Sequence, residues 1–355
     1  SCTKIIYKRP HRTALSPNQA MLPIPRPVSD YFRNKHVLIT GGVGFIGSNL
    51  ARYLVSLDAN VLLVDSLIPK YGGNLYNIAP IRDRVRLNIA DMRDEHGLGF
   101  LVKNQDVIFN LAGQVSHTDS MVDPYADLEI NARSQLSLLE ACRHGNPEVS
   151  IVFASTRQIY GRPQYLPVDE AHPLQPVDVN GINKTAGEWY HILYHNVYGL
   201  KTVSLRLTNT YGPRMRIKDA RQTFLGWWLR QLVEGQTLKI YGDGQQFRDF
   251  NYVDDVVLAL LLAAANEEAN GQIYNLGALE SINLLDLAEL LIDINGQGSY
   301  DIIPFPENRK RIDIGDYQGD FGKICRELEW EPQVDLRAGL ADSLAYYHQQ
   351  LQHYI

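Results

Sequence analysis

The chain has 355 residues, of which 45% are hydrophobic and 21% charged, and its formal net charge is -6 at pH 7. These values are typical of a globular protein with one large or two interdependent domains, and the acidic balance gives no reason to expect nucleic acid as a partner. The three cysteines, Cys2, Cys142 and Cys325, are widely spaced. This spacing argues against a disulfide framework or a zinc cluster and fits a cytoplasmic protein. The longest apolar run, residues 256–265, is too short to cross a bilayer, so we expect no membrane segment.

Residues 1–30 differ in composition from the rest of the chain. They contain several prolines and basic residues, lack a clear hydrophobic period and include a proline-rich stretch at 23–27. No unbroken apolar segment of the signal-peptide kind is present among them. We therefore expect residues 1–30 to be a poorly ordered leader and not an element of the fold.

A short apolar run, a glycine-rich turn and a helical pattern follow one another at residues 35–57. Residues 35–40 are typical of a buried strand, residues 41–47 read GGVGFIG, and residues 49–57 have helical spacing. Glycines in such a turn bring backbone N–H groups close to a pyrophosphate at the positive end of the helix. The pattern predicts a dinucleotide-binding site.

A second strand, residues 59–64, ends in Asp65, about 20 residues beyond the glycines. A carboxylate in this place can accept both hydroxyls of an adenosine ribose and would repel a 2′-phosphate. NAD is therefore favoured over NADP as the cofactor. The alternative is that Asp65 only ends a buried strand.

Strand-like runs continue at residues 85–89, 107–111, 150–154 and 201–207, with helical stretches at 125–143 and 184–197 between them. This alternation predicts an α/β fold, a Rossmann-type doubly wound parallel sheet covered by helices on both faces. Ligands of such sheets gather at the carboxyl ends of the strands. Those ends carry Asp91, Ala112, Gly113, Ser155, Thr156 and Asn209.

The pattern changes beyond residue 213, where helical stretches are expected at 221–233, 254–266, 284–294 and 336–349. A short strand at 273–276 is expected to return to the sheet. We therefore expect an NAD-binding domain at 31–212 with a returning piece near 250–278, and a smaller, mainly helical substrate domain at 213–355. Trp227 and Trp228 have helical surroundings, which favours packing over stacking on a nucleobase.

Several separate motifs occur in an order that resembles the extended short-chain dehydrogenase/reductase family, in particular its nucleotide-sugar epimerases, dehydratases and decarboxylases. The resemblance covers roughly residues 35–350. Its motifs are TGGVGFIG at 40–47, NLAG at 110–113, ST at 155–156 before IYG at 159–161, Lys184, NTYGPR at 209–214, YGDG at 241–244, RD at 248–249 and YVDD at 252–255.

The resemblance implies a reaction in which NAD takes a hydride from a sugar carbon, usually C4. A tyrosine takes the hydroxyl proton, a lysine lowers the pKa of that tyrosine and holds the nicotinamide ribose, and a serine or threonine binds the sugar oxygen. Thr156 and Lys184 match two of these catalytic positions. The tyrosine position is Asn180, and an amide cannot exchange a proton as a phenol does.

Three hypotheses account for a site in which asparagine replaces the proton-accepting tyrosine. Lys184 could itself serve as the base, because burial and a nearby positive charge both lower a lysine pKa. His117 or Tyr160 could handle the proton instead, although a lone histidine in a loop is more often a structural hydrogen-bonder. In the third hypothesis the chain binds NAD and a sugar nucleotide without turnover.

Two further departures concern the positions directly after Thr156. By resemblance, dehydratases carry an Asp-Glu pair there and decarboxylases carry a glutamate at the second position, whereas this chain has Arg157 and Gln158. Elimination is therefore disfavoured, although the 209–214 stretch is similar to the decarboxylases and keeps that alternative open. Arg157 could contact a substrate carboxylate or phosphate, or form a surface ion pair.

The resemblance also assigns binding residues. Those for NAD are Gly41, Gly44, Phe45, Ile46, Gly47, Asp65, Asp91, Met92, Leu111, Ala112, Gly113, Ser155 and Lys184. Those for a nucleotide-diphosphate sugar are Gln114, Ser116, Arg157, Asn209, Lys239, Tyr241, Arg248 and Arg311, with Arg309 as an alternative to Arg311. The helices around 125–143 and 184–198 match a dimer seam of the family, so a homodimer is expected. Together these observations indicate an NAD-dependent nucleotide-sugar epimerase, with a decarboxylase, a dehydratase or an idle binding protein as alternatives.

Overall fold

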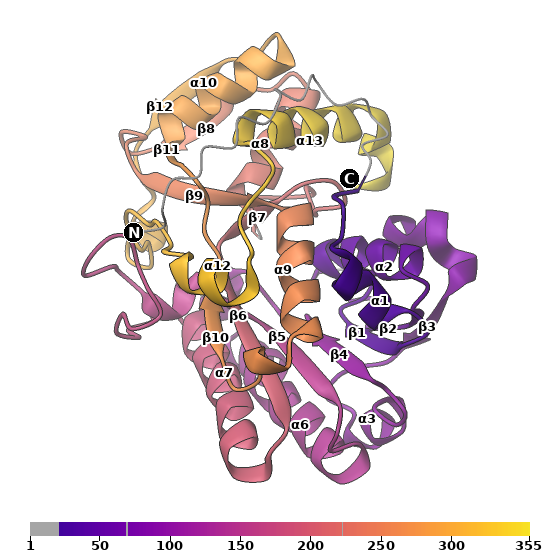
Figure 1. Cartoon of the computed structure of the whole chain (residues 1–355). Helices are drawn as coiled ribbons and strands as arrows, with labels where there is room; N and C mark the ends of the chain where they lie inside the picture. The colour runs from indigo at the N-terminus through magenta and orange to yellow at the C-terminus, as the bar shows by residue number, and fades with distance from the viewer. Residues whose placement is uncertain (1–20, 69, 222) are drawn as a thin grey trace.

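The computed structural model describes residues 21–68, 70–221 and 223–355. Within these residues a parallel sheet of seven strands forms the centre of the protein, in the order β10-β6-β5-β4-β1-β2-β3 (Figure 1). The strands are β1 His36–Thr40, β2 Asn60–Asp65, β3 Val85–Ile89, β4 Val107–Asn110, β5 Ser150–Thr156, β6 Lys201–Leu207 and β10 Ile273–Asn275. The order from β3 to β6 reverses direction at β1, which is the doubly wound arrangement. The predicted fold class is thus confirmed.

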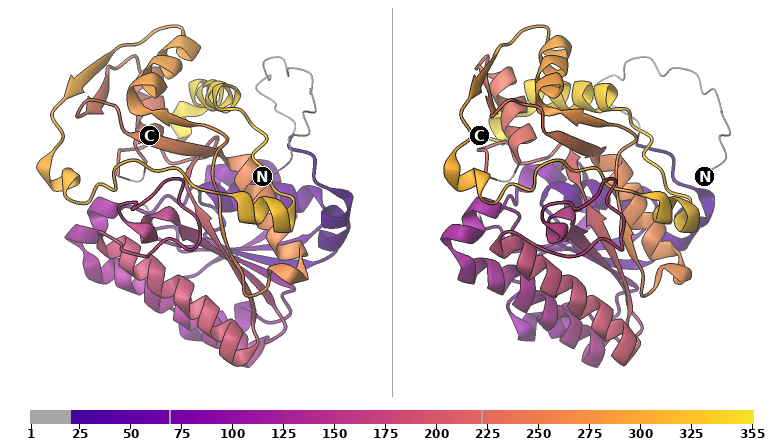
Figure 2. Two further views of the ribbon diagram at one scale, coloured as in Figure 1. Left: turned by 60° about the vertical axis from the view of Figure 1, so that its left-hand side comes forward. Right: turned by 90° about the vertical axis from the view of Figure 1, so that its left-hand side faces the viewer.

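Helices cover both faces of this sheet (Figures 1 and 2). One face carries α3 Glu95–Leu101, α6 Ser134–Gly145 and α7 Val179–Tyr198, and the other carries α1 Arg26–Phe32, α2 Phe45–Ser56 and α9 Val253–Ala265. Central strands such as β4 are buried along their whole length, which explains their unbroken apolar sequences. The apolar run at 256–265 lies in α9 and is almost entirely buried. In the described part of the chain, no helix is long and apolar enough to cross a membrane.

The fold begins earlier than the sequence predicted. Residues 26–30, assigned above to a leader, form most of α1, and Pro27 in its first turn is compatible with a helix start. Val28 and Phe32 lie four residues apart on the buried side of α1, and the Phe32 ring lies 6.2 Å from the Phe109 ring of β4. The leader prediction is therefore wrong for this segment, because one helical turn suffices to bury two apolar side chains. Residues 1–20 lie outside the described residues.

The helix expected at 125–143 is interrupted. It consists of α5 Pro124–Leu128, a π-helical turn η2 Glu129–Arg133, and α6. Asn131 in the π turn is buried and holds Gln114 through two hydrogen bonds, one to its N–H and one to its carbonyl. The π turn thus fixes the loop that follows β4.

A second, smaller unit lies over the carboxyl end of the main sheet (Figure 2). It combines α8 Phe224–Val233, α10 Leu284–Asn295 and α13 Leu336–Gln350 with two small sheets. One sheet joins β7 Asn209–Tyr211, β9 Phe247–Tyr252 and β11 Ser281–Asn283, and the other joins β8 Leu238–Tyr241 and β12 Tyr300–Ile303. Of the strands in the described residues, five were not predicted from the sequence, namely β7, β8, β9, β11 and β12. Four of them have only three or four residues, too few to show alternation, whereas β9 has six. The strand expected at 273–276 does return to the main sheet as β10, which pairs with β6.

The remaining elements are short. They are η1 Leu75–Arg84, α4 His117–Val122, η3 Arg157–Tyr160, η4 Glu267–Ala269, α11 Glu307–Lys310, α12 Gly322–Leu328 and η5 Leu351–His353. Two of them, α4 and η3, follow β4 and β5 at the carboxyl end of the sheet and carry residues of the site described next.

Candidate functional site

A cavity of about 330 Å³ lies where the carboxyl ends of the sheet strands meet the second unit. Its walls come from the segments after β1, β2, β3, β4 and β5, from the start of α7, and from the chain between β6 and α8. This volume and the mixed polar and apolar lining are typical of a small-molecule site. The position is the one expected for ligands of a doubly wound sheet.

The glycine turn after β1 forms one end of the cavity. Gly41 has φ +67°, a conformation that side chains disfavour, and a Cβ on Gly47 would lie 2.3 Å from the Gly41 carbonyl oxygen. The sequence therefore needs glycine here to turn and to pack α2 against β1. Gly44 precedes α2 and offers no side chain to cap its N–H groups, so they remain available to an anion.

Asp65 ends β2 beside this turn and also borders the cavity. Its carboxylate accepts hydrogen bonds from the backbone N–H groups of Val43, at 3.2 Å, and Leu67, at 2.9 Å. Burial raises the pKa of Asp65, although these two N–H groups act to lower it. Asp65 thus stabilises the glycine turn, and a carboxylate has further lone pairs for ribose hydroxyls.

Asp91 and Met92, which follow β3, border the cavity as predicted. A bidentate hydrogen bond from Arg93 lowers the pKa of Asp91. The loop between β4 and α4 contributes Leu111, Ala112 and Gly113. A Cβ on Gly113 would lie 2.8 Å from Nζ of Lys184, so the absence of a side chain at 113 makes room for the lysine.

The dinucleotide half of the cavity fits NAD on these observations. The fit rests on the uncapped helix start, the ribose-type carboxylate of Asp65 and the hydroxyl of Ser155, which is buried and has no hydrogen-bond partner among the described residues. All the residues that the sequence analysis assigned to NAD border the cavity. The chemistry that bound NAD supplies is reversible acceptance of a hydride.

Thr156 and Lys184 both border the cavity. Thr156 ends β5, and its hydroxyl accepts a hydrogen bond from the N–H of Gln158. Nζ of Lys184 lies 3.5 Å from the carbonyl oxygen of Ala154 and 5.4 Å from the centre of the Phe153 ring. Burial lowers the pKa of Lys184 to about 8. At pH 7 most Lys184 side chains therefore still carry a proton.

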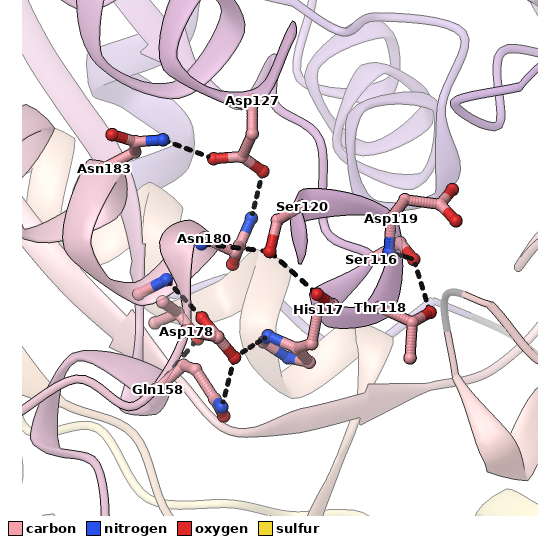
Figure 3. Close-up of polar contacts among 12 residues, drawn as sticks. Ser116, His117, Thr118, Asp119, Ser120, Asp127, Gln158, Asp178, Asn180 and Asn183 are labelled. Carbon is pink, nitrogen blue, oxygen red and sulfur yellow. Dashed lines mark hydrogen bonds and ion pairs between the residues drawn. The ribbon is translucent and has the colours of Figure 1, made fainter. Parts of the chain in front are cut away.

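Asn180 lies one helical turn before Lys184 and is almost fully buried, although it borders the cavity. Its Nδ2 donates to the Gln114 carbonyl oxygen at 2.8 Å. The same nitrogen donates to Oδ2 of Asp127 at 3.1 Å (Figure 3). Both amide protons are therefore in use. The carboxylate of Asp127 also accepts a hydrogen bond from Asn183. Its second oxygen accepts from the amide N–H of Asn180, so the carboxylate bonds an amide donor at position 180. Asn180 is thus a structural connector between α7, α5 and the loop after β4.

Tyr160 lies away from the cavity. Its hydroxyl donates to Oδ1 of Asn275 and accepts from Nη1 of Arg206, both at 2.6 Å, and burial raises its pKa to about 12. The phenol is therefore a buried member of a network between η3, β6 and β10. The hypothesis that Tyr160 replaces the missing base is not supported.

His117, by contrast, borders the cavity. It is the first residue of α4, and its Nδ1 lies 2.9 Å from Oδ2 of Asp178 (Figure 3). Asp178 caps α7 by accepting from the N–H of Gly181 at 2.7 Å, and it also accepts from Nε2 of Gln158 at 3.0 Å. Burial acts to raise the pKa of Asp178, but the bonds from His117, Gly181 and Gln158 lower it below its ordinary value. Neither Asp178 nor Asp127 lies in a recognisable motif, so the sequence alone does not predict them as site residues.

Arg157 reaches into the cavity from η3. Its Nη2 donates to Oδ1 of Asn209 at 3.0 Å, and its guanidinium lies 5.1 Å from the centre of the Tyr317 ring. Nη1 is buried and has no partner among the described residues. Burial lowers the pKa of Arg157, and the nearby Asp249 acts in the opposite direction. The interpretation of Arg157 as a surface ion-pair partner is wrong, since its partners lie inside.

Two residues assigned to the substrate, Gln114 and Ser116, do not border the cavity. Nε2 of Gln114 donates to the Ser116 carbonyl oxygen, and the Ser116 hydroxyl caps α4 by accepting from the N–H of Asp119. Both side chains are nearly fully buried. Their roles are local, because the loop after β4 needs these bonds to start α4.

Four further substrate assignments are not brought to the cavity either. The guanidinium of Arg248 is occupied by the carbonyl oxygens of Phe247 and Gly315 and by Asp313. Lys239 and Tyr241 lie on β8, and Arg311 is exposed beside Glu307. Arg309 approaches the Tyr241 ring instead. In this arrangement only Arg157 and Asn209, among the predicted substrate residues, border the cavity.

The substrate side of the cavity includes residues that the sequence analysis missed. They come from the chain before α8, the start of α8, β9 and the loop after β2, and they are Tyr71, Met215, Arg216, Thr223, Phe224, Leu225 and Phe250. Trp228 is in the core of the second unit and Trp227 lies beside Arg230, so neither borders the cavity. Packing is thus the role of both tryptophans.

A doubly wound sheet with a dinucleotide cradle, joined to a threonine and a buried lysine, defines an NAD-binding enzyme of the short-chain type. Comparison with known proteins places it more narrowly. Residues 37–277 match the model of the NAD dependent epimerase/dehydratase family, and the chain belongs to this family.

Relatives include both epimerases and dehydratases. A putative UDP-glucose 4-epimerase of Methanocaldococcus jannaschii is 33% identical over 309 residues, which cover 86% of this chain and 95% of the relative. CDP-paratose 2-epimerase of Salmonella typhi is 30% identical over 332 residues, 86% of this chain and 96% of the relative. The crystal structure of DesIV, a dTDP-glucose 4,6-dehydratase of Streptomyces venezuelae with NAD bound, matches with a TM-score of 0.82 and 29% identity over 89% of this chain and 98% of that one.

Proposed function

We propose that this protein is an NAD-dependent nucleotide-sugar epimerase that oxidises one sugar carbon, in our proposal C4, and reduces it again within the same site. One observation carries the proposal. A single cavity joins the dinucleotide cradle, the pair Thr156 and Lys184, and a wall of the second unit. An epimerase of this kind needs no redox partner, because the same hydride leaves and returns.

The distribution of carboxylates favours epimerisation over dehydration. Among the described residues that border the cavity, the carboxylates are Asp65 and Asp91, and both lie in the dinucleotide half, after β2 and β3. Elimination needs a base that removes a proton from a carbon beside the oxidised one. Arg157 and Gln158 occupy the places after Thr156, and Gln158 instead donates to Asp178. The relatives that are dehydratases are therefore the weaker guide to this chain.

The substrate of the proposal is a nucleotide-diphosphate sugar. Its anionic part would lie near Arg157, Asn209 and Arg216, because the guanidinium groups suit phosphate oxygens and one nitrogen of Arg157 is unoccupied. Thr156 would donate to the sugar oxygen, and Lys184 would hold the nicotinamide ribose. Phe224 and Phe250 offer apolar surface for the sugar or the base.

We propose a homodimer as the working form. Exposed apolar side chains follow one side of α7 at Ile182, Trp189, Leu193 and Val197, and Tyr125 of the neighbouring α5 is 78% exposed. A contiguous apolar surface of this kind is typical of an interface. A second copy of α5 and α7 would cover it. The low cysteine content supports a reducing, cytoplasmic setting.

A panel of nucleotide sugars tests the proposed activity. The purified protein with NAD would be incubated with UDP-glucose, dTDP-glucose, CDP-paratose and UDP-glucuronate, and the sugars analysed by NMR. We expect one of them to give an isomer of the same mass, with only transient absorbance of reduced nicotinamide. A product that has lost water would identify a dehydratase, and binding of NAD without conversion of any sugar would support the idle binding protein.

A further inference from the structure

Position 180 supplies no acid or base, so the proton of the sugar hydroxyl needs another acceptor in the same cavity. Nδ2 of Asn180 is committed to Gln114 and Asp127, and the Tyr160 hydroxyl lies away from the cavity. Apart from arginines and the two carboxylates Asp65 and Asp91, the ionisable side chains of the described residues that border the cavity are those of Lys184, His117 and Tyr71. Burial raises the pKa of Tyr71, and the nearby Asp123 and Asp119 raise it further, so its phenol is a poor proton acceptor. A neutral imidazole, by contrast, has one ring nitrogen that can accept a proton. The arginines stay charged, and Asp65 and Asp91 lie in the dinucleotide half.

Lys184 is poorly placed to act as the base. Burial lowers its pKa to about 8, and the nearby Asp127 acts in the opposite direction and favours the cation. Its Nζ lies beneath Gly113, against the Ala154 carbonyl oxygen and the Phe153 ring. These contacts suit a cation that holds a neighbouring ribose. They leave little freedom for a side chain that must give up and regain a proton in each turnover.

His117 differs from Lys184 in that its side chain is partly exposed and lies beside a carboxylate. Oδ2 of Asp178, whose side chain is fully buried, lies 2.9 Å from Nδ1 of His117, an ion-pair contact that is not aligned as a hydrogen bond. A carboxylate can only accept, so this contact favours the tautomer of the neutral ring with its proton on Nδ1. Nε2 makes no hydrogen bond within the described part of the chain, and 37% of the His117 side chain is exposed. A neutral imidazole in this tautomer presents a bare nitrogen that can accept a proton.

Two of the departures from the family pattern, Gln158 and Asn180, belong to the same hydrogen-bond network as His117 (Figure 3). Gln158, which stands where the resemblance expects a glutamate, donates Nε2 to the oxygen of Asp178 that faces His117. The backbone N–H of Asn180 donates to the hydroxyl of Ser120, and that hydroxyl donates to the carbonyl oxygen of His117. Gln158 in turn is tied through its N–H to the Thr156 hydroxyl. The network thus connects His117 to the residue expected to bind the sugar oxygen.

We propose that His117, oriented by Asp178, is the general acid/base of this enzyme in place of the missing tyrosine. The inference rests on the proposed function. The O–H bond of the sugar hydroxyl breaks and its proton passes to Nε2 of His117, while the hydride from the same carbon is accepted by a bound oxidised nicotinamide dinucleotide. The resulting imidazolium is stabilised by the ionised Asp178. In the return step Nε2 gives the proton back to the new alkoxide, so no proton or electron is lost.

The first test compares His117→Ala with wild type, after the panel has identified a sugar that wild type converts. We expect kcat to fall by roughly 10²–10⁴ while NAD affinity, measured by calorimetry, changes less than threefold. Added imidazole should restore at least tenfold of the lost rate, because a free base can enter the space that the side chain leaves. His144→Ala is the matched control, since His144 is an exposed residue of α6 beside Glu140, and should match wild type with or without imidazole.

Asp178 is a positioning residue, and Asp178→Asn tests it separately. The amide oxygen can still accept from the N–H of Gly181 and cap α7, so the fold should be retained. We expect kcat to fall tenfold or more. ¹⁵N NMR of histidine-labelled protein, without any sugar, should show Nδ1 of His117 protonated and Nε2 bare in the neutral ring of wild type, and a loss of this preference in the variant. This readout does not depend on activity.

The outcomes separate the two proposals. If wild type converts no sugar of the panel, the proposed function fails and the role of His117 fails with it. If wild type is active and His117→Ala retains more than a third of its kcat, or loses activity that no imidazole restores, only the role of His117 is overturned. A wild-type ring with Nε2 protonated would overturn it as well.

Discussion

Asn180 and Lys184 lie one turn apart on α7, and their surroundings set their roles. Asn180 is held by two acceptors and carries no titratable group, whereas Lys184 is a buried cation. Burial of a cation costs free energy unless a charge or hydrogen bonds compensate for it. For Lys184 the nearby Asp127 offsets only part of this cost, since the pKa remains lowered.

Lys184→Met should therefore stabilise the protein in the absence of NAD. The folded-state pKa of about 8 lies below the ordinary value of 10.5, so the unfolded chain binds the proton more tightly. Below pH 8 the buried charge therefore lowers the free energy of unfolding of wild type by its full amount. This loss becomes smaller as the pH rises toward 10.5, because the folded protein releases the proton. We expect a gain on the order of 2–3 kcal/mol at pH 7 that shrinks by pH 9.5.

Urea unfolding at several pH values measures this difference, and NAD binding should weaken in the same variant. A variant less stable than wild type at pH 7 would contradict the role of burial. Lys201→Met is a suitable control, because Lys201 is exposed beside Glu148 and should change stability little at any pH.

Sequence patterns predicted individual residues unevenly. The glycines of the turn, Asp65, Thr156 and Lys184 could be placed because each belongs to a motif with a local geometric reason. Arg248 could not, because a motif does not reveal that internal carbonyl oxygens already occupy its guanidinium. The pairing of His117 with Asp178 joins residues about 60 positions apart, and only the packing of α4 against α7 brings them together.

At the scale of elements, hydrophobic period predicted the long strands and helices well and the short ones poorly. The central strands are buried on both faces and stand out as apolar runs, whereas β8 and β12 are four residues long and partly exposed. The π turn η2 could not be predicted from the sequence. It is stabilised by two hydrogen bonds between Asn131 and the Gln114 backbone, and local helix propensity does not reveal such contacts. π turns frequently occur near functional sites, and Ile130 in η2 borders the cavity.

Helix α1 illustrates the same limit, and Phe32 tests whether it belongs to the fold. The Phe32 side chain is fully buried in the core that also contains α2, α9 and β4. Phe32→Ala should lower the free energy of unfolding by roughly 3–5 kcal/mol through lost burial and the cavity it leaves. Chemical denaturation measures the change. Arg33→Ala, at an exposed neighbouring position, is the control, and equal stabilities of the two variants would show that α1 is dispensable.

At the scale of the whole molecule, two units share one cavity, and an apolar surface on α5 and α7 remains uncovered. Stable interfaces usually bury more than about 1,000 Å² in total, and the long helix α7 offers a row of exposed side chains for this purpose. The sequence alone indicated this surface only through the family resemblance. The structure adds that the apolar positions 182, 189, 193 and 197 are exposed.

The double variant Trp189→Arg with Leu193→Glu should convert the proposed homodimer to a monomer. The new arginine and glutamate side chains would lose their hydration in the centre of an apolar interface, and this desolvation disfavours association. Light scattering coupled to gel filtration measures the mass. Leu279→Ser, an equally exposed apolar residue in the second unit, should leave the mass at that of wild type. A monomeric wild type would contradict the proposed homodimer.

The central claim, transient oxidation with return of the same hydride, has one direct test. The substrate would carry deuterium at the carbon that is epimerised, and the reaction would run first in H₂O and then, with unlabelled substrate, in D₂O. We predict an isomeric product that retains the deuterium at that carbon and acquires none there from D₂O, because the hydride never exchanges with solvent. Loss of the label to water, or solvent deuterium on that carbon, would contradict the account.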